Sequence, residues 1–170
     1  TTVPLTDIAP DDEFNISSAK NNRALILERF GKTIANAFLH TPHPLRRSVL
    51  AELEAEFPEV VDRTAHAPLR SHTDVSIASS LHHYYAYLTG RSVPAPISCG
   101  FINVGLREQQ TKLTRLLSAR IHDVFCLNDY HDGDVPAEEQ SRIIDTFLTE
   151  YFPTASQFET GTVRNGRVER

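Results

Sequence analysis

The chain has 170 residues, a size that allows one domain or part of a larger one. It carries 17 Lys and Arg against 22 Asp and Glu, which gives a formal net charge of -5. This acidic balance argues against a nucleic-acid binder, which usually shows a basic footprint. Hydrophobic residues make up 40% of the chain, an ordinary value for a globular protein rather than a disordered one. No apolar run approaches the roughly 18 residues of a membrane-spanning helix.

The sequence contains no Met, so we expect it to begin inside a longer polypeptide and to hold only part of an active site. Its two cysteines, Cys99 and Cys126, lie in apolar stretches and are expected to be reduced core residues of an intracellular protein. Two cysteines cannot by themselves build a structural zinc site.

The first half of the chain predicts helices joined by irregular segments. Residues 1–16 are polar and interrupted by prolines, which is typical of a connecting arm. A helical pattern then runs from Ser17 to about Gly31. The sequence HTPHP follows, and its two prolines forbid a regular helix, so His40 and His43 are expected on a stiff, irregular connection.

A second helix is predicted over residues 45–57, because apolar residues recur there every four positions. Pro58 is expected to stop this helix or to restart it as a short turn, and a polar passage follows. Asp74 is a candidate N-cap for a third helix that closes at Thr89 and Gly90.

The second half predicts an α/β unit. Apolar runs at 98–104 and 123–127 indicate strands, and amphipathic patterns at 106–117 and 136–151 indicate helices. A strand–helix–strand connection favours a parallel pair. The domain organisation expected is a connecting arm (1–16), a helical segment (17–95), an α/β segment (96–159) and a polar, frayed tail (160–170).

From the residues alone, several side chains are candidates for chemistry. His40 and His43 form an H-x-x-H that lacks the Glu of a metalloprotease, so ordinary loop histidines are favoured over catalytic ones, and metal ligation is less favoured still. Arg70 could clamp a phosphate or carboxylate through two parallel hydrogen bonds, although a solvated or paired arginine is the simpler interpretation.

Other polar residues have a structural alternative. His82 and His83 fall on a predicted helix, where at least one should be a hydrogen-bonded core residue. Asn128 and Asp129 directly follow a predicted strand. They are interpreted equally well as part of a ligand crevice or as turn residues. The sequence contains no GxGxxG, P-loop or GxSxG motif, so dinucleotide, NTPase and serine-hydrolase functions lack support.

A family resemblance adds to this interpretation. Residues 125–159, FCLNDYHDGDVPAEEQSRIIDTFLTEYFPTASQFE, resemble the fourth signature block of the Stealth family. These hexose-1-phosphoryl transferases build bacterial capsular polysaccharides and exopolysaccharides, and the animal GlcNAc-1-phosphotransferase is a relative. The upstream sequence HTPHPLRRSVLAELEAEFPEVVDRTAHAPLRSHTD is similar to the segment between the third and fourth blocks. The resemblance covers about residues 15–159, and the first three blocks are expected outside this chain.

The resemblance implies the C-terminal portion of a glycosyltransferase-like α/β domain. It also implies transfer of a hexose-1-phosphate, such as GlcNAc-1-phosphate, from a UDP-sugar to an acceptor sugar hydroxyl with release of UMP. By motif match, His40 and Arg70 correspond to active-site positions. The substrate-binding candidates of second rank are His43, Asn22, Arg23, Asp74, Asn128 and Asp129.

A divalent cation, Mg²⁺ or Mn²⁺, is expected with ligands unknown, and no organic cofactor is expected. The expected partners are a nucleotide-sugar donor, a polysaccharide, oligosaccharide or glycolipid acceptor, and the part of the enzyme that carries the other blocks. No nucleic acid is expected, and a homo-oligomer is left open.

The expected location is cytoplasmic, compatible with peripheral association at the inner face of the plasma membrane. This chain alone is expected to be inactive. A conventional glycosyltransferase that releases UDP and a non-catalytic sugar- or partner-binding module remain alternatives.

Overall fold

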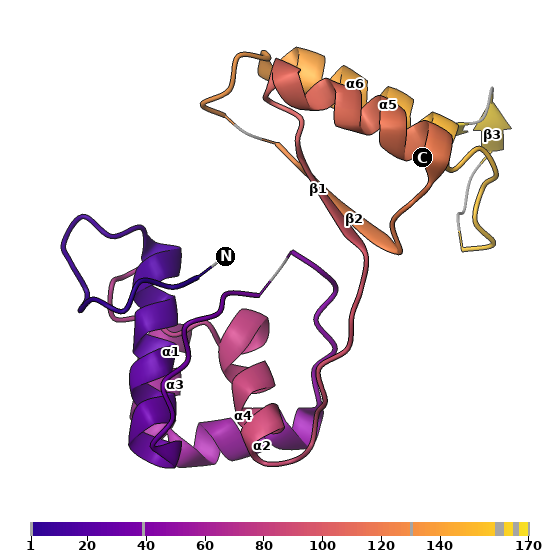
Figure 1. Ribbon diagram of the computed structural model, residues 1–170. Coiled ribbons are helices and arrows are strands. Elements are labelled where there is room, and N and C mark those ends of the chain that lie inside the picture. The colour runs from indigo at the N-terminus through magenta and orange to yellow at the C-terminus, as the bar shows by residue number, and fades with distance from the viewer. Residues whose placement is uncertain (1, 39, 130, 159–161, 165–166, 170) are drawn as a thin grey trace. The chain divides into compact units, whose positions relative to one another are not determined.

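A computed structural model describes residues 2–38, 40–129, 131–158, 162–164 and 167–169. The chain forms two compact units, residues 1–96 and 97–170. Figure 1 shows the first unit as helical and the second as mixed α/β. Within the described residues, no helix is both long enough and apolar enough to cross a bilayer.

The first unit contains four α-helices and one π-helical turn, η1. Their bounds are α1 Phe14–Phe30, α2 Arg47–Glu56, α3 Pro58–His66, η1 Ile77–Leu81 and α4 His82–Leu88. α1 ends at Gly31, whose φ of 63° is the left-handed conformation that favours glycine at a helix C-terminus. The predicted helices are therefore present, but α1 begins three residues before Ser17.

The core of the first unit joins α1, α2 and the η1–α4 segment. Its fully or almost fully buried apolar residues are Ile26, Val49, Leu53, Leu81, Tyr85 and Ala86. Val49 and Leu53 belong to the four-residue repeat that predicted α2, so the apolar stripe does face the core. α3 has no buried residue, which explains why its polar sequence resembled a loop.

The second unit contains a parallel strand pair covered by two helices. β1 (Cys99–Asn103) pairs with β2 (Val124–Asn128), with Cys99 opposite Val124 and Asn103 opposite Asn128. A 3₁₀ turn, η2 (Arg107–Gln109), and α5 (Gln110–Ala119) connect the strands, and α6 (Ala137–Tyr151) follows β2. The predicted strand–helix–strand–helix order is confirmed.

The core of this unit lies between the strand pair and the two helices, which run side by side in Figure 1. It is formed by Ile102, Leu113, Leu116, Phe147 and Tyr151. The two cysteines are free and half-buried, so they are less deeply placed than the sequence predicted. The tail also differs from the frayed segment expected, because β3 (Thr162–Arg164) and β4 (Arg167–Glu169) pair antiparallel.

The structure is thus a mixed α/β protein with six α-helices and one two-stranded parallel sheet among its described residues. The glycosyltransferase-like architecture that the resemblance implies stays a prediction.

Candidate active site

His40 and His43 lie on the irregular connection that the prolines predicted, between the isolated bridge of Asn36 with Thr2 and the start of α2. His40 is exposed, whereas His43 is half-buried. The His43 ring lies 6.2 Å from the Phe38 ring and 5.0 Å from the His83 ring, measured between centroids. The segment that carries both histidines therefore contacts α4 through the His43 ring, while His40 lies at the surface.

His82 and His83 have different environments at the start of α4. His82 is 2% exposed, and its Nε2 accepts a hydrogen bond of 2.9 Å from the backbone N–H of Arg46. It is the structural core histidine that the sequence predicted, and it fixes the residue that precedes α2. Burial lowers the pKa of His82 and of His83, because desolvation disfavours the imidazolium. The neighbouring charge of His43 also lowers the pKa of His83.

Arg70 lies in the loop between α3 and η1. The side chain is exposed, and within the described part of the chain its guanidinium has no hydrogen bond or ion pair. An arginine held at the surface without a protein partner keeps its full fork of donors for a phosphate or carboxylate.

The loop that carries Arg70 is fastened to α1. Asn21 Nδ2 donates to the carbonyl oxygens of His72 and Asp74, at 2.9 and 2.8 Å. The hydroxyl of Ser17 is hydrogen-bonded to His72 Nδ1 at 2.8 Å, and both residues are shielded from solvent to a large extent. The backbone beside Arg70 is therefore anchored, whereas no described residue engages its guanidinium, so the donors of that guanidinium are available to an anion.

Asp74 is not the helix cap that the sequence predicted. Its Oδ2 accepts a hydrogen bond of 2.7 Å from the backbone N–H of Ser71, so the carboxylate closes the turn before it instead of the helix after it. Ser76 occupies the N-cap position of η1, and no side chain caps that turn. Asp74 Oδ1 is buried without a hydrogen-bond partner among the described residues. Asp74 thus shapes the Arg70 loop, and substrate binding by this residue stays a prediction.

Asn22 and Arg23 make hydrogen bonds within the protein. Asn22 is 1% exposed, and its amide bonds to the backbone of Ser76 and to the hydroxyl of Ser80. Arg23 donates to the carbonyl oxygens of Pro4 and Thr6, at 2.7 and 3.1 Å, and so anchors the N-terminal arm. The structure gives both residues anchoring roles, and substrate binding by them stays a prediction.

Asn128 and Asp129 belong to the second unit, at the carboxyl end of β2. Asn128 Nδ2 donates to Asn103 Oδ1 at 2.7 Å, so the two amides that end the parallel strands are joined. Gln109 Oε1 accepts from the N–H of Asn103 at 3.1 Å and extends this polar edge. Asp129 is exposed. The carboxyl edge of a parallel sheet is where ligands bind in open α/β folds.

Sequence reasoning missed Asn21 and Asn103. Asn21 is next to Asn22 on α1, and only the direction of its side chain shows that it holds the Arg70 loop. Asn103 could have been found, because it ends β1 as Asn128 ends β2, and the two strands are parallel and in register.

The described residues contain no group of three or more His, Cys, Asp or Glu side chains placed to hold a metal ion. They therefore do not fit the complete site for the divalent cation that the resemblance implies. What they can supply is an exposed guanidinium and imidazoles, which suit binding of an oxyanion and movement of a proton.

The chain thus combines a helical unit, which carries an exposed arginine and histidines, with a separate α/β unit. Comparison with known families specifies the class. Residues 39–87 match Stealth protein CR3, conserved region 3, and residues 114–169 match Stealth protein CR4, conserved region 4. The chain belongs to the Stealth family. The third conserved region is thus present, which corrects the expectation that only the fourth block lies in this chain and that residues 17–95 fall between the two.

Similar proteins carry names that agree with this family. The chain is 55% identical over 159 residues to the exopolysaccharide phosphotransferase SCO2592 of Streptomyces coelicolor. The aligned region covers 94% of this chain and 17% of the relative. It is 43% identical to SCO6023 of the same organism, over 92% of this chain and 27% of the relative. It is 41% identical to the exopolysaccharide phosphotransferase CpsY of Mycobacterium tuberculosis, over 84% of this chain and 27% of the relative. The chain thus spans between a sixth and about a quarter of the length of these relatives.

Proposed function

We propose that this chain is part of an exopolysaccharide phosphotransferase and supplies His40 and Arg70 to its active site. The observation that carries the proposal is that His40 and Arg70 both lie in the segment matching conserved region 3, where the Arg70 guanidinium is exposed, has no partner among the described residues and is carried by an anchored loop. The relatives named exopolysaccharide phosphotransferases support the same activity.

The proposed reaction transfers a hexose-1-phosphate, such as GlcNAc-1-phosphate, from a UDP-sugar to a sugar hydroxyl. The acceptor oxygen forms a bond to the sugar-bound phosphorus, and the bond from that phosphorus to the bridging oxygen of the diphosphate breaks. UMP leaves with the electron pair of that bond, and the product is a phosphodiester. The acceptor hydroxyl proton must go to a base.

In this reaction Arg70 binds the phosphoryl or diphosphate oxygens through its paired donors. His40 either takes the acceptor proton or donates a hydrogen bond to the phosphoryl group. A divalent cation would neutralise part of the phosphate charge when bound. Its ligands are expected mainly in the part of the enzyme outside this chain, together with the donor-binding regions.

The test uses the complete enzyme with a panel of UDP-sugars, an acceptor oligosaccharide and Mg²⁺ or Mn²⁺, and identifies the released nucleotide. We expect UMP, and we expect Arg70→Ala to slow its release by on the order of a hundredfold or more, because the phosphate charge would be left unmatched. The matched control is Arg115→Ala, which removes an exposed arginine from α5. Release of UDP would identify a conventional glycosyltransferase. No release from a folded enzyme would favour a binding module.

A further inference from the structure

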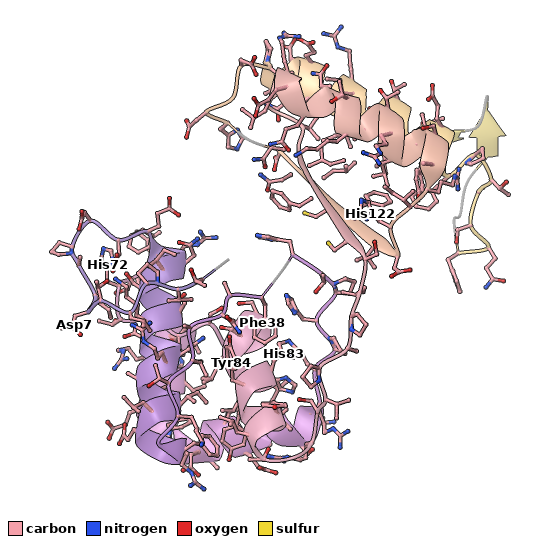
Figure 2. All side chains as sticks on the ribbon, in the orientation of Figure 1. Asp7, Phe38, His72, His83, Tyr84 and His122 are labelled. Atoms are coloured by element: carbon pink, nitrogen blue, oxygen red, sulfur yellow. The ribbon has the colours of Figure 1, made fainter. Side chains whose placement is uncertain are left out.

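Phe38, His43, His83 and Tyr84 form a cluster of four rings between the His40 connection and α4. The ring centroids are 5.1 Å apart for Phe38 and His83, 5.0 Å for Phe38 and Tyr84, and 5.0 Å for His43 and His83. Figure 2 shows the labelled side chains of Phe38, His83 and Tyr84 gathered beside α4. The sequence predicted neither this four-ring cluster nor any role for His83 beyond the core.

Within the cluster, one polar atom has no partner. His83 Nε2 is buried and makes no hydrogen bond with any described residue. The nearby backbone of Ala78 favours a proton on the ring, and we place this proton on the other nitrogen, Nδ1. The neutral imidazole then leaves a lone pair on Nε2. An unsatisfied buried acceptor typically costs about 1–3 kcal/mol, so a native structure is expected to provide a donor for it.

The His43 ring is placed to be that donor. A ring nitrogen lies about 1.1 Å from the centroid of an imidazole, so an N–H···N hydrogen bond of about 2.9 Å joins rings whose centroids are about 5 Å apart. The observed separation of His43 and His83 is 5.0 Å, with an angle of 40° between the ring planes. This separation matches the one that an N–H of His43 needs to reach His83 Nε2.

Two further features favour this pairing. The Phe38 ring lies beside both imidazoles, with its centroid 6.2 Å from that of His43 and 5.1 Å from that of His83, so an apolar side chain adjoins the pair. Burial, the charge of His43 and that of His82 lower the pKa of His83, so the ring stays neutral and keeps its lone pair at neutral pH.

We propose that His83 is a positioning residue, which accepts a hydrogen bond from the His43 imidazole and thereby fixes the connection that presents His40. The kinetic consequence rests on the proposed function, whereas the hydrogen bond does not. In this arrangement His43 acts through the protein, on the orientation of His40, rather than on the substrate.

The first experiment measures the hydrogen bond in the 170-residue chain itself. Nitrogen-15 NMR of the imidazoles should show a His43 ring N–H that exchanges slowly with water at neutral pH. His83→Phe keeps a ring of similar size but removes the acceptor, so it should speed this exchange at least tenfold. His83→Gln, which places an amide oxygen near the position of Nε2, should restore part of the protection. Equally fast exchange in the unaltered chain and in His83→Phe would overturn the proposal.

The second experiment uses the complete enzyme. His83→Phe should lower kcat for UMP release about tenfold with little change in the KM of the UDP-sugar, because the donor site is not altered. His83→Gln should recover part of the rate, and His66→Phe, a change at an exposed histidine of α3, should not alter it. Unchanged kcat in His83→Phe would overturn the positioning role. If the unaltered enzyme released no UMP, the proposed function would fail, and the exchange experiment would still decide whether the hydrogen bond exists.

Discussion

Asn22 and Ser76 hold each other at two points. Asn22 Nδ2 donates to the carbonyl oxygen of Ser76 at 2.9 Å, and Asn22 Oδ1 accepts from the N–H of Ser76 at 3.1 Å. A third bond, of 2.6 Å, joins Asn22 Nδ2 to the hydroxyl of Ser80. One buried amide thus ties α1 to the π-helical turn that introduces α4.

Replacing Asn22 by Ala should therefore destabilise the first unit by about 1–3 kcal/mol, because the N–H of the half-buried Ser76 would lose its acceptor, while the Ser76 carbonyl would keep only the N–H of Leu81 and the hydroxyl of Ser80 as donors. Urea unfolding, followed by circular dichroism, measures the loss. Glu28→Ala, on the exposed side of the same helix, is the control and should change the free energy of unfolding by no more than about 0.5 kcal/mol. A similar small effect of Asn22→Ala would contradict the anchoring role.

A lysine–aspartate pair predicts the acid sensitivity of the same unit. Lys20 Nζ lies 2.6 Å from Asp12 Oδ2 and 2.8 Å from the carbonyl oxygen of Asp7, and only 3% of the Lys20 side chain is exposed. The hydrogen bond from Lys20, followed by that from the backbone of Ala9, lowers the pKa of Asp12. Because the carboxyl is more acidic in the folded state, its contribution is present above the ordinary Asp pKa and is lost as the pH falls through the lower folded value.

Stability should accordingly decline below about pH 4, near the ordinary Asp pKa. Asp12→Asn, which removes the titrating group, should flatten that decline while lowering stability at pH 7. Urea midpoints measured between pH 2.5 and 7 check both effects. Asp11→Asn, an exposed neighbour, is the matched control. An acid limb that is equally steep with and without the Asp12 carboxyl would refute the assignment.

The two adjacent histidines predict a second pH dependence with a different window. Burial lowers the pKa of His82 and of His83. The unfolded chain therefore takes up protons at a higher pH than the folded one, so stability is full above about pH 6.5 and falls as the pH drops below it. His82→Gln should reduce this slope, and the exposed His66→Gln should not; unfolding midpoints at pH 5.5 and 7.5 distinguish them.

Much of the secondary structure follows from local pattern. The Leu and Val repeat of α2 and the strand–helix–strand order of the second unit are determined by burial periodicity, which a sequence displays directly. The prediction of local contacts failed where a polar side chain had more than one hydrogen-bond partner within reach. Asp74 could cap the next helix or close the preceding turn. In the structure its carboxylate accepts a hydrogen bond from the backbone N–H of Ser71, so it closes the turn. α3 was missed because Pro58 predicted a stop or a short turn and the residues that follow are mostly polar, with none of them fully buried.

The candidate site was less predictable for the same reason. His43 and His83 are forty residues apart, and only the path of the chain between α2 and α4 brings their rings to 5.0 Å. Neighbours on a helix are equally ambiguous. Asn21 and Asn22 lie side by side in sequence, yet one holds the Arg70 loop and the other holds the π-helical turn. The exposure of Arg70 was one of the alternatives that the sequence left open, because an arginine in a polar loop needs no long-range contact to stay in solvent; its role in binding phosphate stays a prediction.

A glycine contact in the second unit supports a prediction about the loop that follows β2. A Cβ added at Gly133 would lie 2.0 Å from the carbonyl oxygen of Gly105, a backbone atom that also accepts from the N–H of Val135. Gly133→Ala should therefore displace this loop and cost about 2 kcal/mol or more, as overpacking against backbone does. Gly31→Ala is an instructive comparison, since its Cβ meets no atom within 4 Å and only its φ of 63° is unfavourable, at about 1 kcal/mol.

The final prediction concerns the geometry of the Arg70 guanidinium rather than its charge. Arg70→Lys keeps the positive charge on the fixed loop but replaces the planar fork by a single ammonium, which cannot form two parallel hydrogen bonds with a phosphate. In the complete enzyme, kcat/KM for the UDP-sugar should fall at least about tenfold, as for loss of about 1.4 kcal/mol of transition-state binding. Arg115→Lys should leave kcat/KM unchanged. Full activity in Arg70→Lys together with a large loss in Arg70→Ala would mean that Arg70 acts only as a point charge, and that bidentate clamping of the phosphate is wrong.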